Sequence, residues 1–453
     1  MTNSVIFTPL TINGVRFENR ILRSSVGGRS CNYDGTVTDV WKNFESTFAE
    51  GGVGGIISTT FHVNKHRLSP LQYPSIADDK YVPYLEKYIA QIKKHGKYDC
   101  KYIVQIGDPG YATYTSLFPE ERDAVSSSWG FDLAFGYNNT RHEMSDGDVK
   151  KSIDEYGAAA GRAKAAGADG VEITATKGYL IHQFLNPGIN RRKDKWGGDA
   201  DRRFRFLKEI VIEVRKKVGA DFLLGIRLSG ADYNCKPFLL ALFRLPWPFL
   251  SRERRMGNDL PRMLDYAKRL EELGVDYLHV VSGYGFPNPR DVPGEFPFDE
   301  IRMFFDSVRH LSFKAAARAA LVHLLPTFLG RWLFNLGWRR RPAVNLDFAR
   351  GFKKAVALPV ISNGGYQERD LIEQAIDSKA CDMVSMARAL IANPCLVKDF
   401  EDGRNAPANP CSHCNRCVGR TTTGPLGCYD ARRFTSREEM VKQIMGWNQP
   451  DPA

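Results

Sequence analysis

Four of the nine cysteines in this 453-residue chain lie close together in the stretch NPCSHCNRCVGRTTTGPLGCYD. Cys411, Cys414 and Cys417 follow a C-x2-C-x2-C spacing, and Cys428 comes after ten more residues. Three closely spaced thiolates with a distant fourth are typical of [4Fe–4S] ligands. A structural zinc site more often has two separated C-x2-C pairs. The spacing therefore favours an iron–sulfur cluster, with zinc and unligated thiols as the open alternatives.

A second group of residues could bind a phosphate. The segment ISNGG ends in Gly364 and Gly365, and the segment SMARAL contains Ala387 and Arg388. Backbone N–H groups at such turns and helix N-termini bind phosphate, and in (β/α)8 barrels the loops after the seventh and eighth strands frequently do so. The two segments together predict a phosphorylated cofactor, with ordinary tight turns as the alternative.

Two polar side chains near the ends of other apolar runs could meet the polar edge of a cofactor ring. Gln105 lies in KYIVQIG, and Arg227 lies in FLLGIRLS. A guanidinium beside such a ring would also stabilise the negative charge that develops there on reduction. A structural ion pair is the alternative for Arg227.

The elements that must position these residues are eight strand-length apolar runs bounded by glycine or polar residues. The runs cover residues 20–26, 52–60, 101–107, 170–176, 222–229, 277–283, 358–365 and 381–387. Amphipathic stretches such as 81–96, 153–167 and 202–219 lie between most of them and predict helices. Eight such units predict an α/β fold, a (β/α)8 TIM barrel with its chemistry at the C-terminal strand ends. A doubly wound open sheet is the alternative.

Bulk properties indicate an ordinary globular protein in a reducing compartment. Hydrophobic residues make up 43% of the chain and charged residues 25%. Five cysteines are scattered outside the cluster, which is unlike a secreted disulfide scaffold. The N-terminal MTNSVIFTPL lacks a basic region followed by an apolar one, so no secretory signal is predicted. We therefore expect a cytoplasmic protein.

Two predicted insertions after the fifth and sixth strands, at about 235–257 and 305–344, are both apolar and basic. Residues 236–255 carry five basic residues and one acidic residue, and residues 309–341 carry seven basic residues and no acidic one. The net charges of the two segments, +4 and +7, together equal the formal net charge of the whole chain, +11. Arginine interleaved with Leu, Phe and Trp predicts contact with the anionic inner face of a membrane, without a span. Partner docking is the alternative, and nucleic-acid binding is not expected.

Several segments closely resemble the Old Yellow Enzyme class of NADH:flavin oxidoreductases. The segments are FTPLTINGVRFENRILRSS, DGTVTDVWKNFESTFAEGGVGGIIS, GYLIHQFLNPGINRRKDKWGGDADRRFRFL, DMVSMARALIANP and the cysteine stretch. The iron–sulfur branch with 2,4-dienoyl-CoA reductase and trimethylamine dehydrogenase is the most similar, and the resemblance covers nearly the whole chain except the insertions. It implies an FMN-binding TIM barrel over 1–405 and a [4Fe–4S]-binding segment over 406–453.

The resemblance also implies roles for single residues. By motif position, Ser25 and Val26 would lie along the isoalloxazine ring of FMN, Gln105 would bind its pyrimidine edge, and Arg227 would face its N1/O2 side. The residues implied to hold the phosphate are Gly364, Gly365, Ala387 and Arg388. The cluster beside the flavin would carry single electrons to it or away from it.

Tyr179, in KGYLIHQF, stands where reductases of this class place a tyrosine proton donor. A phenol suits that step because it stays protonated at pH 7, although a buried core tyrosine is the alternative. A pair that often grips the substrate carbonyl, His followed by His or Asn, is replaced here by Thr174 and Lys177. Lys177 is a candidate cationic replacement, with a solvated lysine as the alternative. The segment SGYGFPNPRD also lacks the histidine that dienoyl-CoA reductases carry there.

The resemblance further bears on the electron donor. Relatives with this cysteine segment continue into an FAD and pyridine-nucleotide module, whereas this sequence ends 25 residues after Cys428. We therefore expect a separate electron-donor protein, with direct NAD(P)H reduction as the alternative. The expected reaction reduces an activated C=C bond of a small hydrophobic substrate. Two alternatives remain: a dehydrogenase that passes electrons out through the cluster, and a non-catalytic electron-transfer subunit of a membrane complex. Whether the chain forms a homo-oligomer is left open.

Overall fold

Eight parallel strands form the centre of the molecule. The structure is a computed structural model that describes residues 4–67, 72–112, 124–131, 140–234, 256–285, 288–421 and 423–448. The strands are β3 (Ile21–Arg23), β4 (Gly55–Ile57), β6 (Lys101–Gly107), β10 (Gly170–Ala175), β11 (Leu223–Ser229), β12 (Tyr277–Val281), β13 (Val360–Asn363) and β14 (Met383–Met386). They pair in chain order, and the pairing of β14 with β3 closes the sheet. The predicted TIM barrel is confirmed, one strand falling in each predicted run, and the open sheet is excluded.

The barrel strands are buried along nearly their whole length, because helices cover their outer faces and side chains fill the interior. Their register sets polar residues side by side. Gln105 pairs with Glu172, Thr174 with Arg227, and Arg227 with His279. Polar side chains from four neighbouring strands therefore meet inside the barrel near its C-terminal end.

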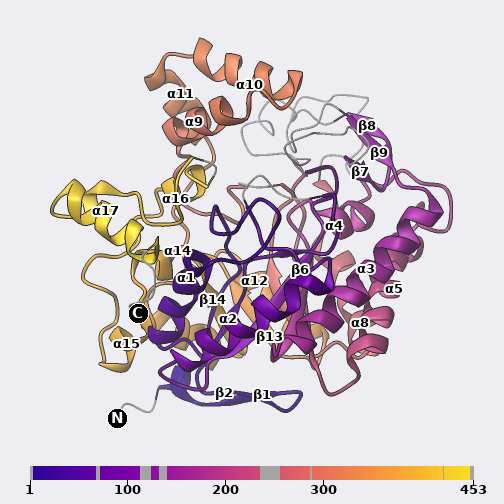
Figure 1. The fold of residues 1–453 in the computed structure, drawn as a ribbon, viewed down its shortest axis with the longest axis horizontal. Helices are drawn as coiled ribbons and strands as arrows, with labels where there is room; N and C mark the ends of the chain where they lie inside the picture. Colours follow the sequence, from indigo (N-terminus) through magenta and orange to yellow (C-terminus); the bar gives the residue numbers. More distant parts are fainter. Residues whose placement is uncertain are drawn as a thin grey trace.

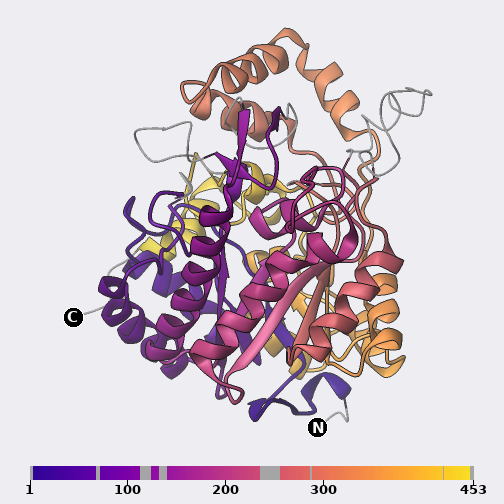
Figure 2. The same ribbon diagram turned by 90° about the vertical axis from the view of Figure 1, so that its right-hand side faces the viewer.

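Helices surround the barrel (Figures 1 and 2). They are α1 (Asp39–Glu50), α2 (Val82–Lys94), α3 (Asp146–Ala165), α5 (Ala200–Val218), α8 (Leu260–Glu272), α12 (Leu346–Ala355), α13 (Arg369–Asp377), α14 (Arg388–Ala392) and α15 (Leu396–Glu401). The three predicted helices are confirmed as α2, α3 and α5. Helix α3 begins at Asp146, ahead of the predicted residue 153, because Ser145 and Asp148 form a capping box there.

Smaller elements mark the two ends of the barrel. The hairpin of β1 (Leu10–Ile12) and β2 (Val15–Phe17) lies at the N-terminal end, at the bottom of Figure 1. The elements toward the other end are β5 (Phe61–His62), β7 (Val125–Ser126), β8 (Gly130–Phe131), β9 (Thr140–Glu143) and α4 (Leu180–Leu185). The C-terminal strand ends, where the chemistry was predicted, face this more elaborate side.

The second predicted insertion, residues 305–344, forms helices above the C-terminal end of the barrel. Helices α9 (Phe298–Val308), α10 (Phe313–Leu324) and α11 (Thr327–Asn335) lie opposite the β1–β2 hairpin in both views (Figures 1 and 2). The insertion therefore overhangs the predicted active-site face. The other predicted insertion, 235–257, lies outside the described residues except for its last two. Within the described ranges, no helix is both long and apolar enough to cross a bilayer.

The C-terminal segment packs directly against the barrel. It contains α16 (Arg416–Gly419) and α17 (Arg437–Met445). Leu426 and Trp447 belong to the same apolar core as the barrel helices. Trp447 also packs edge-to-face on Phe44 of α1, with ring centroids 5.0 Å apart. The cysteine segment is thereby held at a fixed place on the barrel.

Candidate active site

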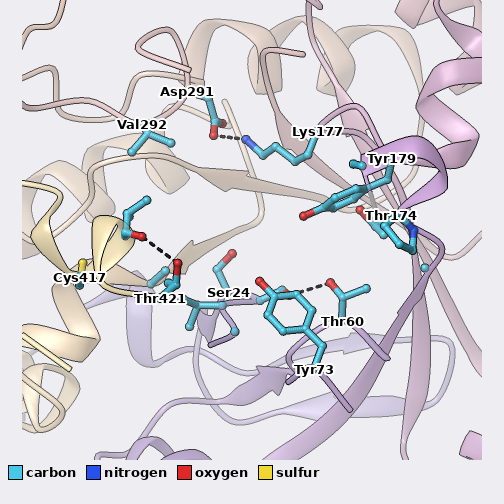
Figure 3. A pocket seen from close by; sticks show the side chains of 18 of the residues that line it. Ser24, Thr60, Tyr73, Thr174, Lys177, Tyr179, Asp291, Val292, Cys417 and Thr421 are labelled. Carbon is cyan, nitrogen blue, oxygen red and sulfur yellow. Dashed lines mark hydrogen bonds and ion pairs between the residues drawn. The ribbon is translucent and has the colours of Figure 1, made fainter. Parts of the chain in front are cut away.

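A cavity of about 340 Å³ lies at the C-terminal ends of the barrel strands. Figure 3 shows Tyr73, Lys177 and Tyr179 directed into the same space. Eight of the ten residues predicted to act on cofactor or substrate line this cavity. They are Ser25, Val26, Gln105, Lys177, Tyr179, Arg227, Ala387 and Arg388. Residues spread over more than 360 positions of the chain are thus brought together as the barrel rule predicts.

Gly364 and Gly365, the other two predicted residues, do not line the cavity themselves but follow Asn363, which does. Their φ values of +119° and +81° turn the chain sharply after β13, in a conformation that favours glycine. A Cβ atom would lie 2.5 Å from Val344 Cγ1 if added to Gly364, and 2.8 Å from the Arg341 carbonyl oxygen if added to Gly365. The turn therefore requires both glycines, and their binding of a phosphate stays a prediction.

Arg227 enters the cavity from β11 as a cation without an ion pair. Its exposed fraction is only 8%, and its Nε atom has no hydrogen-bond partner. No carboxylate in the described part of the chain lies within ion-pair distance of it, so the structural ion pair is not observed. A buried polar group without a partner costs about 1–3 kcal/mol, and more when it is charged. The site therefore suits an acceptor from outside the protein chain.

Gln105 is held by a buried hydrogen-bond network. Its Nε2 donates to Glu172 at 2.6 Å, and its Oε1 accepts from the Thr60 hydroxyl. Glu172 lies 3.0 Å from Nδ1 of His279, whose Nε2 lies 2.8 Å from the Ser385 hydroxyl. Burial acts to raise the pKa of Glu172, but the His279 ring, Arg227 and Gln105 together outweigh it, and the pKa falls below its usual value. The network thus fixes the amide of Gln105 and leaves it one N–H for a ligand.

Lys177 is buried rather than solvated, which excludes the alternative considered for it. It adopts a left-handed backbone conformation, with φ +61°, just after β10. Its ammonium forms an ion pair with Asp291 and donates to the Ser282 carbonyl oxygen at 3.3 Å. Burial lowers the pKa of Lys177 to about 8, although Asp291 opposes this shift. Sequence reasoning missed Asp291, whose only signal was its place in the loop after the sixth strand.

Tyr179 precedes α4 and points its phenol into the cavity (Figure 3). Burial raises the pKa of this phenol, and Arg227 opposes the shift. Tyr73 faces the same space, and burial together with the nearby Tyr179 raises its pKa as well. The ring of Tyr73 is stacked on His62 with centroids 5.8 Å apart. Tyr73 was also missed, because it lies in a loop that carries no recognisable motif.

The four cysteines of the C-terminal segment line a second, smaller cavity. Burial raises the pKa of the Cys417 thiol, and the nearby thiols of Cys411, Cys414 and Cys428 raise it further. Burial also raises the pKa of the Cys411 and Cys414 thiols. Arg433 Nη1 donates to Cys428 Sγ at 3.1 Å. Among the residues described, no three Cys, His, Asp or Glu side chains are arranged around a point where they could hold a single metal ion.

The two cavities adjoin. Arg388 and Cys417 line both of them, and Thr421 of the cysteine segment also lines the larger one. Arg388 donates to the carbonyl oxygen of Pro293 at 2.7 Å and to the side-chain oxygen of Asn415. Its guanidinium therefore stands between the predicted phosphate site and the cysteines. Any group bound by the thiolates would be a close neighbour of a cofactor in the barrel.

Comparisons with known proteins find similar sequences over most of the chain. The model of the NADH:flavin oxidoreductase / NADH oxidase family matches residues 5–237, and the dihydrouridine synthase model matches residues 338–426. An NADH oxidase of Thermoanaerobacter brockii is 28% identical over 91% of this chain and 53% of its own length. An NADPH dehydrogenase of Geobacillus thermodenitrificans is 33% identical over 66% of this chain and 79% of its own length.

Among solved structures, a 2-naphthoyl-CoA reductase in complex with 2-naphthoyl-CoA has a TM-score of 0.70 and 22% identity. The match covers 91% of this chain and 54% of that one. At this identity the likeness concerns the fold. The chain spans about half the length of several of the proteins that it matches over most of its own residues.

Proposed function

Because the chain belongs to the NADH:flavin oxidoreductase / NADH oxidase family, we propose that it uses FMN and a [4Fe–4S] cluster to reduce an activated C=C bond of a hydrophobic substrate. One observation carries this proposal. Tyr179 and the unpaired Arg227 face one cavity, which Cys417 lines as well. The proposed proton donor, a cation that could stabilise a reduced flavin ring and a cysteine of the proposed cluster segment thus line one space.

The cavity residues fit FMN, which supplies hydride when bound. Arg227 offers an unsatisfied, buried guanidinium, and Gln105 offers an amide N–H, as the N1/O2 side and pyrimidine edge of the flavin ring require. Ser25 and Val26 are placed to contact the ring face. The phosphate would be held by Gly364, Gly365, Ala387 and Arg388. These roles rest on family membership together with the position of each residue at the cavity.

Tyr179 is the proposed proton donor. Reduction of a C=C bond next to a carbonyl needs hydride at one carbon and a proton at the other. The raised pKa of Tyr179 keeps its phenol protonated through the neutral range, so it can hold the proton until the carbon accepts it. Tyr179 also points into the cavity instead of packing in the apolar core (Figure 3).

Lys177 is the proposed group that binds the substrate oxygen. An ammonium has three N–H donors, and Asp291 and Ser282 engage two of them. The third is available to an oxygen in the cavity that Lys177 lines. Charge that develops on the substrate carbonyl would thereby be stabilised by a fixed cation in a water-poor site. Asp291 keeps that cation in place as a positioning residue.

The cysteine segment is the proposed cluster site. A zinc ion, bound at about 2.3 Å by each sulfur, would draw four thiolates around a single point. In a [4Fe–4S] cluster each thiolate binds its own iron, so the thiolates surround a larger volume. Three cysteines at C-x2-C-x2-C spacing and a distant fourth, all lining one small cavity, support the cluster. Its electrons would come from a separate donor protein or from NAD(P)H acting on the flavin.

Anaerobic half-reactions test this function. The purified protein is titrated with NADH, NADPH and dithionite while flavin and cluster absorbance are followed, which identifies the electron source. The photoreduced enzyme is then mixed with an enone, and oxidised enzyme with the matching saturated ketone or an amine. Fast reoxidation by the enone is expected. Bleaching of oxidised enzyme by the saturated compound or amine would indicate a dehydrogenase, and indifference to all of them an electron-transfer subunit.

A further inference from the structure

Helix α10 buries Ala315, Ala319 and Val322 on its inward face, but its outward face is apolar as well, unlike that of an ordinary surface helix. Its outward face carries Phe313, Leu321 and Leu324, whose exposed fractions are 82%, 59% and 79%. The alanines at positions 316, 317 and 320, between them, are also exposed. Lys314 faces inward and is only 4% exposed. A surface helix normally turns its polar side to water, so the outward face of α10 is made for an apolar surrounding.

Helix α11 extends this apolar face after a break at Pro326. Phe328 and Trp332 are 75% and 63% exposed, and Leu329 and Leu336 are exposed to a lesser degree. Both helices lie at the outer edge of the molecule in the two ribbon views (Figures 1 and 2). We call the exposed apolar side chains of α10 and α11 the apolar face.

Basic residues flank the apolar face, and no acidic residue occurs between Asp306 and Asp347. Arg309, Arg339 and Arg340 are exposed, and within the described ranges they form no ion pair. Exposed Phe, Leu and Trp beside unpaired arginines match an anionic phospholipid membrane, in which an apolar interior lies beneath a negatively charged headgroup layer.

The apolar face adjoins the active site. Phe304 and Phe305 of α9 and Arg318 of α10 line the same cavity as Tyr179. Helices that carry exposed apolar side chains on one side thus form the roof of the catalytic cavity on the other. A molecule dissolved in a contacted bilayer would have a short path to that cavity.

We propose that α10 and α11 rest on an anionic phospholipid membrane, so that the active-site cavity opens toward it and receives a lipophilic acceptor from the bilayer. A second copy of the chain fits less well, because a two-fold contact would bring the same basic residues of both copies together, and their positive charges would repel one another. The attachment is independent of the reaction, and only the delivery of the acceptor rests on the proposed function.

Vesicle co-sedimentation of the full chain tests the attachment. The protein is mixed with vesicles of phosphatidylcholine alone or with phosphatidylserine at a ratio of about 70:30, at low and high salt. We expect at least tenfold stronger binding to the anionic vesicles, weakened by salt. The quadruple variant Phe313→Ser, Leu324→Ser, Phe328→Ser and Trp332→Ser should lose this binding at least tenfold.

Matched controls separate contact from damage. The pair Tyr84→Ser and Ile212→Ser removes exposed apolar side chains from α2 and α5, and should leave binding unchanged. Arg339→Gln with Arg340→Gln should reduce the preference for anionic vesicles. Unchanged thermal unfolding and unchanged reoxidation by a small soluble enone would show that a variant is intact, whatever its membrane affinity.

Three results would overturn the proposal. One is no binding to either kind of vesicle, and another is binding that ignores lipid charge and survives the quadruple substitution. The third is a dimer in light scattering that the quadruple variant dissociates, which would assign the apolar face to a second copy. If the protein binds anionic vesicles but is not reoxidised by the enone, membrane contact is supported and the proposed function is refuted.

Discussion

The strand ends below the barrel cavity and the helices above it depart from the ordinary rules of burial in opposite ways. Below the cavity, charge is buried, and Lys177 and Glu172 are each satisfied by partners within the chain. Arg227 is the buried cation there without such a partner in the described residues. Above the cavity, Phe313 and Trp332 leave large apolar surfaces in water.

The contrast indicates what kind of binding partner suits each region. A buried, unpaired guanidinium needs an acceptor small enough to enter the cavity, as the ring of FMN is. Exposed aromatic and aliphatic side chains on a convex pair of helices need a broad apolar surface, such as a bilayer. Departures from local rules tend to mark functional sites in natural proteins, and these two departures support the proposal of chemistry in one region and of contact in the other.

The largest expected effect comes from the cysteine segment, which connects the two regions. Cys414→Ala should lower the iron content from about four atoms per chain, the number that the cluster requires, to well below one atom per chain. FMN content should stay near one per chain, because Cys414 does not line the barrel cavity. Anaerobic purification with iron and flavin analysis measures both. Stoichiometric zinc without iron in the unaltered protein would contradict the cluster.

The next effect is catalytic and belongs to the strand-end region alone. Tyr179→Phe should leave flavin reduction nearly intact but slow reoxidation by an enone by about a hundredfold or more, since a general acid is lost. Stopped-flow half-reactions separate the two steps. Tyr73→Phe is the matched control, because its phenol faces the same cavity. If Tyr179→Phe reoxidises at the unaltered rate while Tyr73→Phe is slow, the proton comes from Tyr73.

Much of the barrel could be predicted from the sequence because each strand is a short local pattern. The strands Ile21–Arg23 and Met383–Met386 are mostly apolar and fully buried, as strands covered on both faces are. Gln105 and Arg227 could then be placed at the cavity, since all barrel strands end on one face. The start of α3 was misplaced because its first seven residues, Asp146–Ser152, include Val149 as their one apolar side chain and so show no periodic apolar signal.

The rest could not be predicted because it depends on side chains that meet across long stretches of chain. Lys177 and Asp291 are 114 residues apart, and no local pattern links them. The inward direction of Lys314 likewise follows from how α10 packs on α9, so sequence alone could not show that the opposite, apolar side faces out. Position along a strand is local information, whereas pairing and exposure are properties of the assembled fold.

An effect of about tenfold is expected from pH and sharpens the role of Lys177. Its pKa of about 8 lies below the ordinary 10.5, so the ammonium loses its charge as pH rises through about 8, and enone reoxidation should fall there. The free energy of unfolding should change in the opposite direction, increasing between about 8 and 10.5, because the unfolded chain still binds the proton that the folded one has released. In Lys177→Met both changes should be absent.

The smallest expected effect concerns the roof and would define where the two regions divide. Phe305→Ala removes part of the apolar lining of the cavity without touching Tyr179 or Lys177. Loss of part of a phenyl contact should raise the KM of a long-chain enone by about three- to fivefold and leave kcat unchanged, since such contacts bind substrate and transition state equally. The KM of a short, soluble enone should stay within about twofold, because it does not reach the roof. A fall in kcat with the short enone would mean that the roof takes part in the chemistry, and the division between strand ends that react and helices that deliver would no longer hold.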